Sequence, residues 1–292
     1  MRVGRRIQLP KSGKKFYDRI RALVVDDGVI YGAYGSELYR IGEKVELICG
    51  HDKTVSSVSV GGRFLVCASY DCTATIFIKN GSVEFHDTVE GPETEIKACY
   101  VGDGQLLLAT RGQVVWVLDA SNGSFEVTRI IDDHSQDVKG VRKWGGRVYS
   151  WSYDRTVKEY AGDEIELVDS VDCGSIVWNT LFVGDKMVAF LQNGSMRVFR
   201  KAGGFWQVES VIPVSHTPIL HSCLSVEHSL IAVVANGTVL VIFDDEFNII
   251  NRCDLGSRID SICFSGETVL VGVDGWIWYI DEVVIRVSGG SN

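Results

Sequence analysis

Residues 133–160 read DHSQDVKGVRKWGGRVYSWSYDRTVKEY, and this stretch contains the pattern that decides the fold. His134 stands in an acidic turn, and Asp154 follows twenty residues later, after two short stretches that read as strands. His51 and Asp71 repeat the pattern with the same separation. The two histidines lie 83 residues apart, about two periods of 41–42. Self-similarity at such a period indicates a propeller built from four-stranded blades.

Tight turns between a second and a third strand extend this period along the chain. They are placed at Gly35, Asp71, Gly112, Asp154, Asn193, Asn236 and Asp274. Successive turns are 36 to 43 residues apart, and an apolar strand follows each one. No segment carries a convincing helical period over three turns. The sequence therefore predicts an all-β propeller with seven blades and four antiparallel strands in each blade.

A ring of blades must close, because an open sheet edge invites aggregation. Residues 5–9 alternate like a strand ahead of the first blade, and we expect this N-terminal strand to complete the last blade. Residues 283–287 are a rival for that role, or a fifth strand beside it. We expect residues 1–287 to form a single propeller domain and residues 288–292 to form a flexible tail.

The charge distribution argues against broad binding to nucleic acid. The net charge is −9, and the basic residues are concentrated at the start, where residues 1–21 hold eight Lys or Arg against one acid. The predominantly acidic remainder is poorly suited to neutralising phosphates. The basic start is too short for a mitochondrial presequence, and no apolar run reaches the length of a membrane span. We expect no direct nucleic-acid or membrane partner.

Cysteine and histidine patterns predict neither a cofactor nor a metal centre. The eight cysteines form no Cys-x-x-Cys motif, and most stand in apolar strand patterns, as buried reduced thiols of a cytosolic or nuclear protein do. His216, His221 and His228 fall in loop-like sequence and make a weak ligand set. No Gly-x-Ser-x-Gly, Walker loop or His-Glu-x-x-His motif occurs. We expect no enzymatic activity.

The repeat resembles WD40, whose pattern runs Gly-His, strand, Ser-x-Asp and strand ending Trp-Asp. One blade holds Gly50-His51 and Ser69-Tyr70-Asp71, with Phe77 at the Trp position and Cys67 where the family has a hydroxyl. The other good blade holds His134, with Ser150 as the expected hydroxyl and Tyr160 at the Trp position. The resemblance implies that His, hydroxyl, Asp and the aromatic residue brace each blade, which is a structural role.

Residues 106–180 also resemble a narrower group, the propeller subunit of the cytosolic iron–sulfur protein assembly (CIA) targeting complex. The resemblance rests on His134 to Lys139, Ser152 to Lys158, Val177-Trp178 and a preceding stretch that includes Arg111. It implies a cytoplasmic scaffold, with the nucleus as a second location, that helps transfer assembled clusters to apo-proteins. The implied partners are a small scaffold subunit, a HEAT-repeat adaptor and the apo-protein clients. It does not imply that this chain binds a cluster itself, and we expect a monomer.

The residue before each turn is expected on one rim of the ring. These rim residues are Tyr34, Tyr70, Arg111, Tyr153, Gln192, Ala235 and Val273. Tyr and Arg dominate protein–protein hot spots, so we expect the first four to bind a partner, with Trp151 and Arg155 extending the patch. Arg111 is favoured because its own turn holds no acidic residue. The alternative is a generic WD40 adaptor, such as a ubiquitin-ligase substrate receptor or a chromatin peptide reader.

Overall fold

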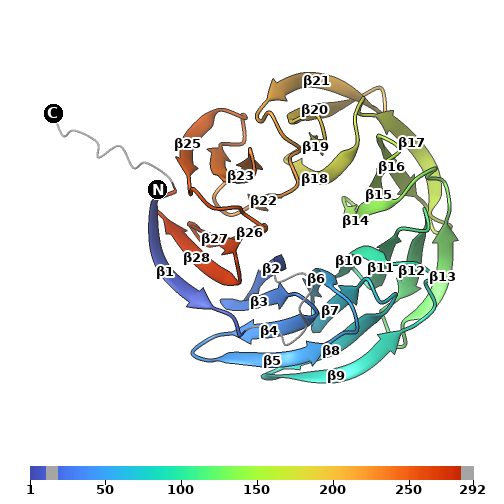
Figure 1. The fold of residues 1–292 in the computed structure, drawn as a ribbon. Helices are drawn as coiled ribbons and strands as arrows, with labels where there is room; N and C mark the ends of the chain where they lie inside the picture. The colour runs from blue at the N-terminus through green and yellow to red at the C-terminus, as the bar shows by residue number, and fades with distance from the viewer. Residues whose placement is uncertain (11–18, 284–292) are drawn as a thin grey trace.

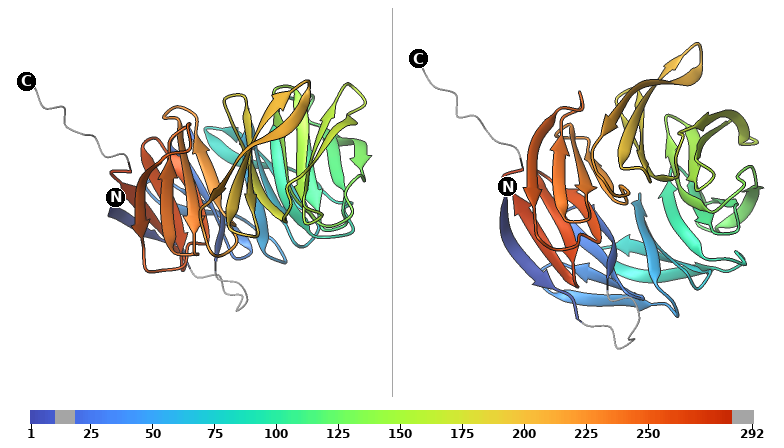
Figure 2. Two further views of the ribbon diagram at one scale, coloured as in Figure 1. Left: turned by 90° about the horizontal axis from the view of Figure 1, so that it is seen from above. Right: turned by 45° about the horizontal axis from the view of Figure 1, so that its top comes forward.

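A computed structural model describes residues 1–10 and 19–283, which form twenty-eight strands in seven four-stranded antiparallel sheets. The sheets stand as blades around a ring (Figure 1). Strands run from one face of the ring to the other, so the loops gather on two faces (Figure 2). The predicted seven-bladed architecture is confirmed. No helix in the described part of the chain is long and apolar enough to cross a membrane.

Strands at equivalent positions of the blades share one place in the ring. The innermost strands are β2 (Ile20–Asp26), β6 (Val55–Gly61), β10 (Ile96–Gly102), β14 (Val138–Trp144), β18 (Val177–Val183), β22 (Ser222–Ser225) and β26 (Ser261–Ser265). The second strands are β3 (Val29–Tyr34), β7 (Phe64–Ser69), β11 (Gln105–Thr110), β15 (Arg147–Ser152), β19 (Lys186–Leu191), β23 (Leu230–Ala235) and β27 (Thr268–Val273). The third strands are β4 (Glu37–Ile41), β8 (Ala74–Asn80), β12 (Val115–Asp119), β16 (Thr156–Ala161), β20 (Ser195–Ala202), β24 (Val239–Phe243) and β28 (Trp276–Asp281). The outermost strands are β1 (Arg2–Gln8), β5 (Val45–Gly50), β9 (Ser82–Val89), β13 (Glu126–Ile131), β17 (Glu166–Asp172), β21 (Phe205–Pro213) and β25 (Ile249–Asp254).

The N-terminal strand closes the ring, as predicted. β1 pairs antiparallel with β28, the third strand of the last blade, and supplies the fourth strand of that sheet (Figure 1). Val3 pairs with Ile280, and Gln8 pairs with Trp276. This pairing covers the edge that β28 would otherwise expose. The proposed tail and all of the rival strand except Val283 lie outside the described residues.

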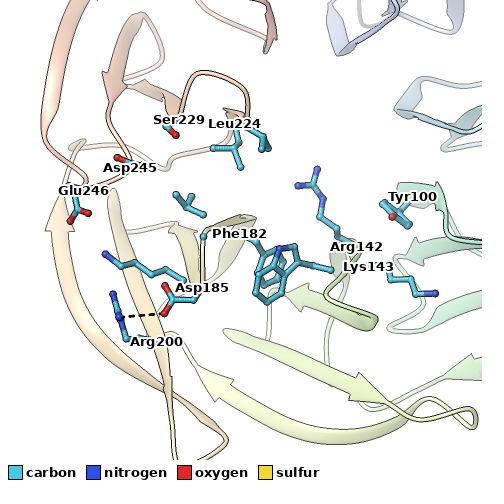
Figure 3. A pocket seen from close by; sticks show the side chains of 15 residues that line it. Tyr100, Arg142, Lys143, Phe182, Asp185, Arg200, Leu224, Ser229, Asp245 and Glu246 are labelled. Carbon is cyan, nitrogen blue, oxygen red and sulfur yellow. Dashed lines mark ion pairs between the residues drawn. The ribbon is translucent and has the colours of Figure 1, made fainter.

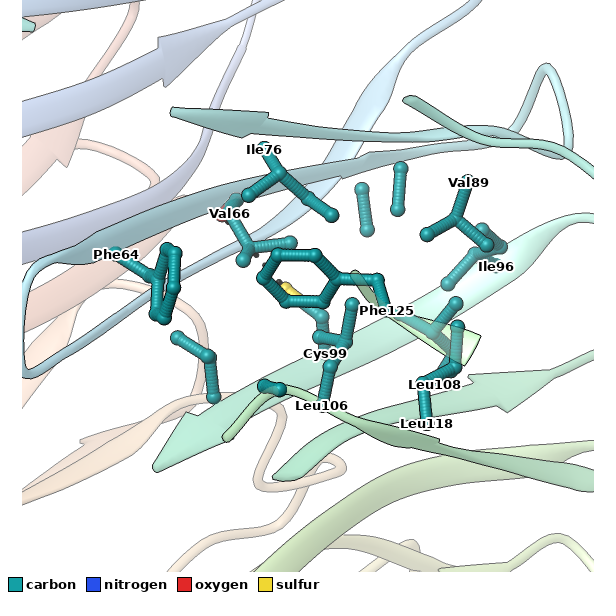
Figure 4. Close-up of a cluster of buried hydrophobic side chains, with 14 residues drawn as sticks. Phe64, Val66, Ile76, Val89, Ile96, Cys99, Leu106, Leu108, Leu118 and Phe125 are labelled. Atoms are coloured by element: carbon teal, nitrogen blue, oxygen red, sulfur yellow. Dashed lines mark hydrogen bonds between the residues drawn. The ribbon is translucent and has the colours of Figure 1, made fainter. Parts of the chain in front are cut away.

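The core lies between neighbouring blades. Each second strand is apolar along most of its length, because both of its faces pack on adjacent sheets; every residue of β7, β19 and β23 is buried. Between the second and third blades, Phe64 meets Phe125 edge-on with ring centroids 5.1 Å apart (Figure 4). Burying one such side chain stabilises the fold by about 1.5–3 kcal/mol. Adjacent blades therefore hold each other in place.

The brace expected in the His134 blade is confirmed. His134 Nδ1 donates to Asp154 at 2.7 Å, and His134 Nε2 lies 2.7 Å from the Ser150 hydroxyl, which is 3.5 Å from the hydroxyl of Tyr160. The His51 blade keeps the first part, with His51 Nδ1 2.9 Å from the Asp71 carboxylate, while the hydroxyl 3.2 Å from its Nε2 belongs to Thr75 of the third strand. These histidine–carboxylate pairs hold strand to loop inside a blade and take no part in the surface described next.

Candidate protein-interaction site

A β-bulge recurs near the start of five inner strands. In β10, Ile96 pairs with Thr110 and Ala98 with Ala109, so Lys97 has no partner in the ladder. The same shift occurs in the other four strands, and the five extra residues are Arg21, Ser56, Lys97, Lys139 and Trp178. A bulge re-aims a side chain out of the pleat. All five bulges lie at the same end of the ring.

The rim residues stand beside these bulges because of the hairpins that hold them. In blades two to four the second and third strands are joined by three-residue loops, whose last residue has a positive φ. Tyr70, Arg111 and Tyr153 are the first loop residues. The backbone N–H of each donates to the carbonyl of the residue two positions before its bulge, for example from Arg111 to Glu95 at 2.9 Å. Rim residue and bulge residue are thereby fixed as neighbours.

Six of these side chains form what we call the aromatic–cation cluster: Tyr70, Lys97, Arg111, Lys139, Tyr153 and Trp178. Lys97 Nζ lies 4.5 Å from the centre of the Tyr70 ring. Lys139 Nζ lies 5.2 Å from the Tyr153 ring and 4.6 Å from the Trp178 ring. Those two rings meet edge-on at 5.3 Å, and Trp178 Nε1 donates to Gln192 at 2.6 Å. Ammonium groups on aromatic faces at these distances are cation–π contacts.

Partial burial lowers the pKa of both lysines in the cluster, Lys97 and Lys139. Burial lowers the pKa of Lys139 to about 8, and repulsion from Lys97 lowers it further in the same direction. Burial also lowers the pKa of Lys97. Burial, with Arg21, Arg258 and Lys139 nearby, holds the pKa of His221 at about 4. Positive charge therefore gathers at this end of the ring, although the chain as a whole carries −9.

Arg111 meets acids that its own turn does not contain. Its guanidinium lies 3.0 Å from the Glu95 carboxylate and 4.0 Å from the carboxylate of Asp137, in the next blade. Its own turn holds no acidic residue, as the sequence shows, but the loops that lead into β10 and β14 bring these two acids to it. The side chain is still 58% exposed. Arg111 thus combines a fixed orientation with an accessible surface.

Tyr34 does not belong to the exposed rim. The hairpin between β3 and β4 has a two-residue loop, in which Tyr34 still pairs with Glu37. Gly35, whose N–H donates to the Arg19 carbonyl, holds the place that Arg111 has in its blade. A shift of one residue turns a strand side chain to the other face, and Tyr34 is only 3% exposed. The expectation that Tyr34 lines the surface is wrong.

Trp151 and Arg155 lie apart from the cluster surface. Trp151 is only 6% exposed and packs against Gly140, so the expectation that it extends the surface patch is wrong. Its Nε1 donates to the Trp178 backbone carbonyl at 3.3 Å, and this hydrogen bond helps to hold Trp178 of the cluster in position. Arg155 is exposed, but it ends its loop and lies 3.6 Å from Asp172 at the end of the outer strand β17. Arg155 therefore stands at the periphery.

Lys97 and Lys139 are the residues that sequence reasoning missed. Each lies fourteen positions before a rim residue, Arg111 and Tyr153 respectively, and the same interval separates Trp178 from Gln192. This interval identifies the bulge residues only after the bulge itself is known. A lysine one residue into an apolar strand is the single signal that the sequence offers for them.

A pocket of 770 Å³ opens at the opposite ends of the inner strands (Figure 3). Arg142 and Trp144, near the end of β14, line it together with Phe182 of β18. Charges of both signs surround it, and its Arg200 pairs with Asp185 at 3.4 Å. None of the rim residues predicted from the sequence lines this pocket.

The comparisons with known proteins agree with this architecture. The crystal structure of the WD40 β-propeller domain of Doa1 is similar to this chain, with a TM-score of 0.75 and 14% sequence identity. The similarity covers 93% of this chain and 96% of that chain. No protein-family model matches the sequence, and no curated protein does. At 14% identity the likeness shows the fold alone, and the chain is an all-β, seven-bladed propeller of the WD40 type.

Proposed function

We propose that this chain is a non-catalytic scaffold that binds a protein partner through the aromatic–cation cluster. The observation that carries the proposal is the pair of partly buried ammonium groups, Lys97 and Lys139, set on aromatic faces at one end of the ring. Aromatic residues and Arg are the side chains that dominate binding hot spots. The positive charge at the end of the ring that carries this cluster, which we call the mouth, favours a partner segment that carries carboxylates.

The biological setting that we propose is cytosolic iron–sulfur protein assembly, in the cytoplasm, with the nucleus as a second location. The support is the resemblance of residues 106–180, a stretch that supplies Arg111, Lys139, Tyr153 and Trp178 of the cluster. The proposed partners are the small scaffold subunit and the HEAT-repeat adaptor of the targeting complex, together with its apo-protein clients. The generic WD40 adaptor remains the second candidate, supported by the fold alone.

Affinity capture with mass spectrometry tests both proposals. The full chain and its Arg111→Glu variant would be tagged and recovered from cells under identical conditions. We expect the wild type to recover iron–sulfur assembly factors. The variant should lose them, because the substitution replaces a guanidinium with a third carboxylate beside Glu95 and Asp137. Its melting temperature should stay near that of the wild type. Histone or ubiquitin-ligase partners would instead support the second candidate, and binding that survives the substitution would exclude Arg111 from the site.

A further inference from the structure

A second group of reactive side chains lies away from the aromatic–cation cluster, between the first two blades. Among residues 1–10 and 19–283, Cys49, His51 and Cys67 are the one group of three or more His, Cys, Asp or Glu whose ligand atoms could converge on a metal, all within 4.8 Å of one another. Cys49 lies one residue before the end of the outer strand β5 of the first blade, and Cys67 belongs to β7 of the second. Cys67 is fully buried, whereas Cys49 is partly exposed.

The equivalent brace in the His134 blade shows what these cysteines replace. At a constant offset of 83 residues, Cys67 stands where Ser150 stands, and Cys49 stands where Asp132 stands. Ser150 Oγ lies 2.7 Å from Nε2 of its histidine. In the His51 blade a sulfur takes that place, and the nearest hydroxyl to Nε2 belongs to Thr75 at 3.2 Å. The position at which an ordinary brace has a hydroxyl is therefore occupied by a soft ligand.

We infer that Cys49, His51 and Cys67 form a binding site for a thiophilic divalent cation, Zn²⁺. Two thiolates and one imidazole are a ligand set that Zn²⁺ takes in proteins, with a fourth position open to water or another ligand. His51 Nδ1 donates to the Asp71 carboxylate at 2.9 Å, and such a carboxylate characteristically orients a ligating histidine through its other nitrogen. Bound Zn²⁺ would tie the outer strand of the first blade to the second blade.

Zn²⁺ binds cysteine as the thiolate, so occupation of this site would release protons from the two thiols.

Titration with Zn²⁺ in the presence of a reductant and a competing chromophoric chelator tests the inference. We expect about one tightly bound Zn²⁺ per full-length chain, confirmed by native mass spectrometry, and thiolate-to-metal charge-transfer absorption when Co²⁺ is used as the probe. Cys67→Ser should weaken Zn²⁺ binding at least about 100-fold, because loss of a direct ligand exceeds the 10- to 100-fold effect typical of residues that only support one. This variant restores the hydroxyl of an ordinary brace, so it should still fold.

Two further variants make the result decisive. Cys49→Ser provides a second ligand deletion if Cys67→Ser fails to fold. Cys263→Ser removes a buried thiol of the last blade and should bind Zn²⁺ as the wild type does. A wild type that binds no Zn²⁺, or a Cys67→Ser variant that binds it as tightly as the wild type, would overturn the inference.

Discussion

Lys139 contributes a charge that depends on pH within the physiological range. Its pKa of about 8 means that the ammonium is mostly present at pH 7 and mostly lost at pH 9, and the pKa of Lys97 is lowered as well. We predict that affinity for an acidic partner falls as the pH rises through 8. Lys139→Arg keeps its charge over this range and should flatten the dependence. Titration calorimetry at pH 7 and pH 9 measures both; equal pH dependence would exclude Lys139.

His134 illustrates a residue whose pattern was visible and whose role is structural. It is buried, and His134→Ala would remove the histidine hydrogen bond of both Ser150 and Asp154. We predict a loss of about 2–4 kcal/mol in the free energy of unfolding, measured by urea denaturation. His216→Ala is the matched control, since that side chain is exposed and should change stability by less than about 0.5 kcal/mol. Similar losses for the two variants would contradict the brace.

At this scale the sequence predicts the braces well and the binding surface only in part. His134, Ser150 and Asp154 keep fixed spacings because hydrogen bonds require them, so the spacing reveals the contact. Lys97 and Lys139 reach the surface through a bulge, and a bulge depends on how two strands align. A lysine one residue into an apolar strand does not by itself reveal that alignment. Tyr70, Arg111 and Tyr153 were placed correctly on the rim, although their binding role stays a prediction.

Among the strands, β14 contains a position that admits only glycine. A methyl group on Gly140 would lie 2.1 Å from the Trp151 ring, which itself supports Trp178. We predict that Gly140→Ala destabilises the fold by about 1–3 kcal/mol, because the indole must move in a packed interior. Tryptophan fluorescence followed during thermal unfolding would show it. Gly42→Ala, where a methyl group meets nothing within 4 Å, should leave the midpoint nearly unchanged.

The strand β1 joins the two ends of the ring. Deletion of residues 1–8 would uncover the edge of β28 and part of the core around Ile7. We predict a lower melting temperature and concentration-dependent aggregation, measured by scanning calorimetry and light scattering. A synthetic peptide of residues 1–9 added in trans should restore both properties. A truncated chain that stays monomeric and equally stable would show that β1 is dispensable for closure.

The order of the strands and the closure of the ring were predictable because each follows from a repeated unit. The conformation of each hairpin was harder to predict, since the length of the loop differs between blades. Tyr34 precedes a turn in the sequence, as the other rim residues do. Because its loop has only two residues, Tyr34 is the last residue of its strand rather than the first of the loop, and it is buried. A difference of one residue in the length of a turn is too small to be seen in a sequence repeat of about forty residues. It is nevertheless enough to exchange an exposed side chain for a buried one.

The molecule as a whole is acidic, but basic side chains gather at the mouth of the ring. The chain carries −9, yet Arg21, Lys139 and Arg258 lie near the half-buried His221 at the mouth of the ring, and Lys97 lies near Lys139. An acidic body repels acidic partners in general, while the mouth attracts a carboxylate that reaches it, so orientation is selected during approach. Such binding should weaken as salt is added, because exposed charges are screened.

The most direct test compares two arginine variants on opposite faces of the ring. Arg111→Glu changes the aromatic–cation cluster, and Arg200→Glu makes the same change at a similarly exposed arginine beside the opposite pocket. The dissociation constant of the captured partner would be measured calorimetrically for both and for the wild type. We predict that Arg111→Glu raises it by at least about tenfold, or about 1.4 kcal/mol, while Arg200→Glu leaves it unchanged. The reverse result would place the interaction on the other face and contradict the proposed site.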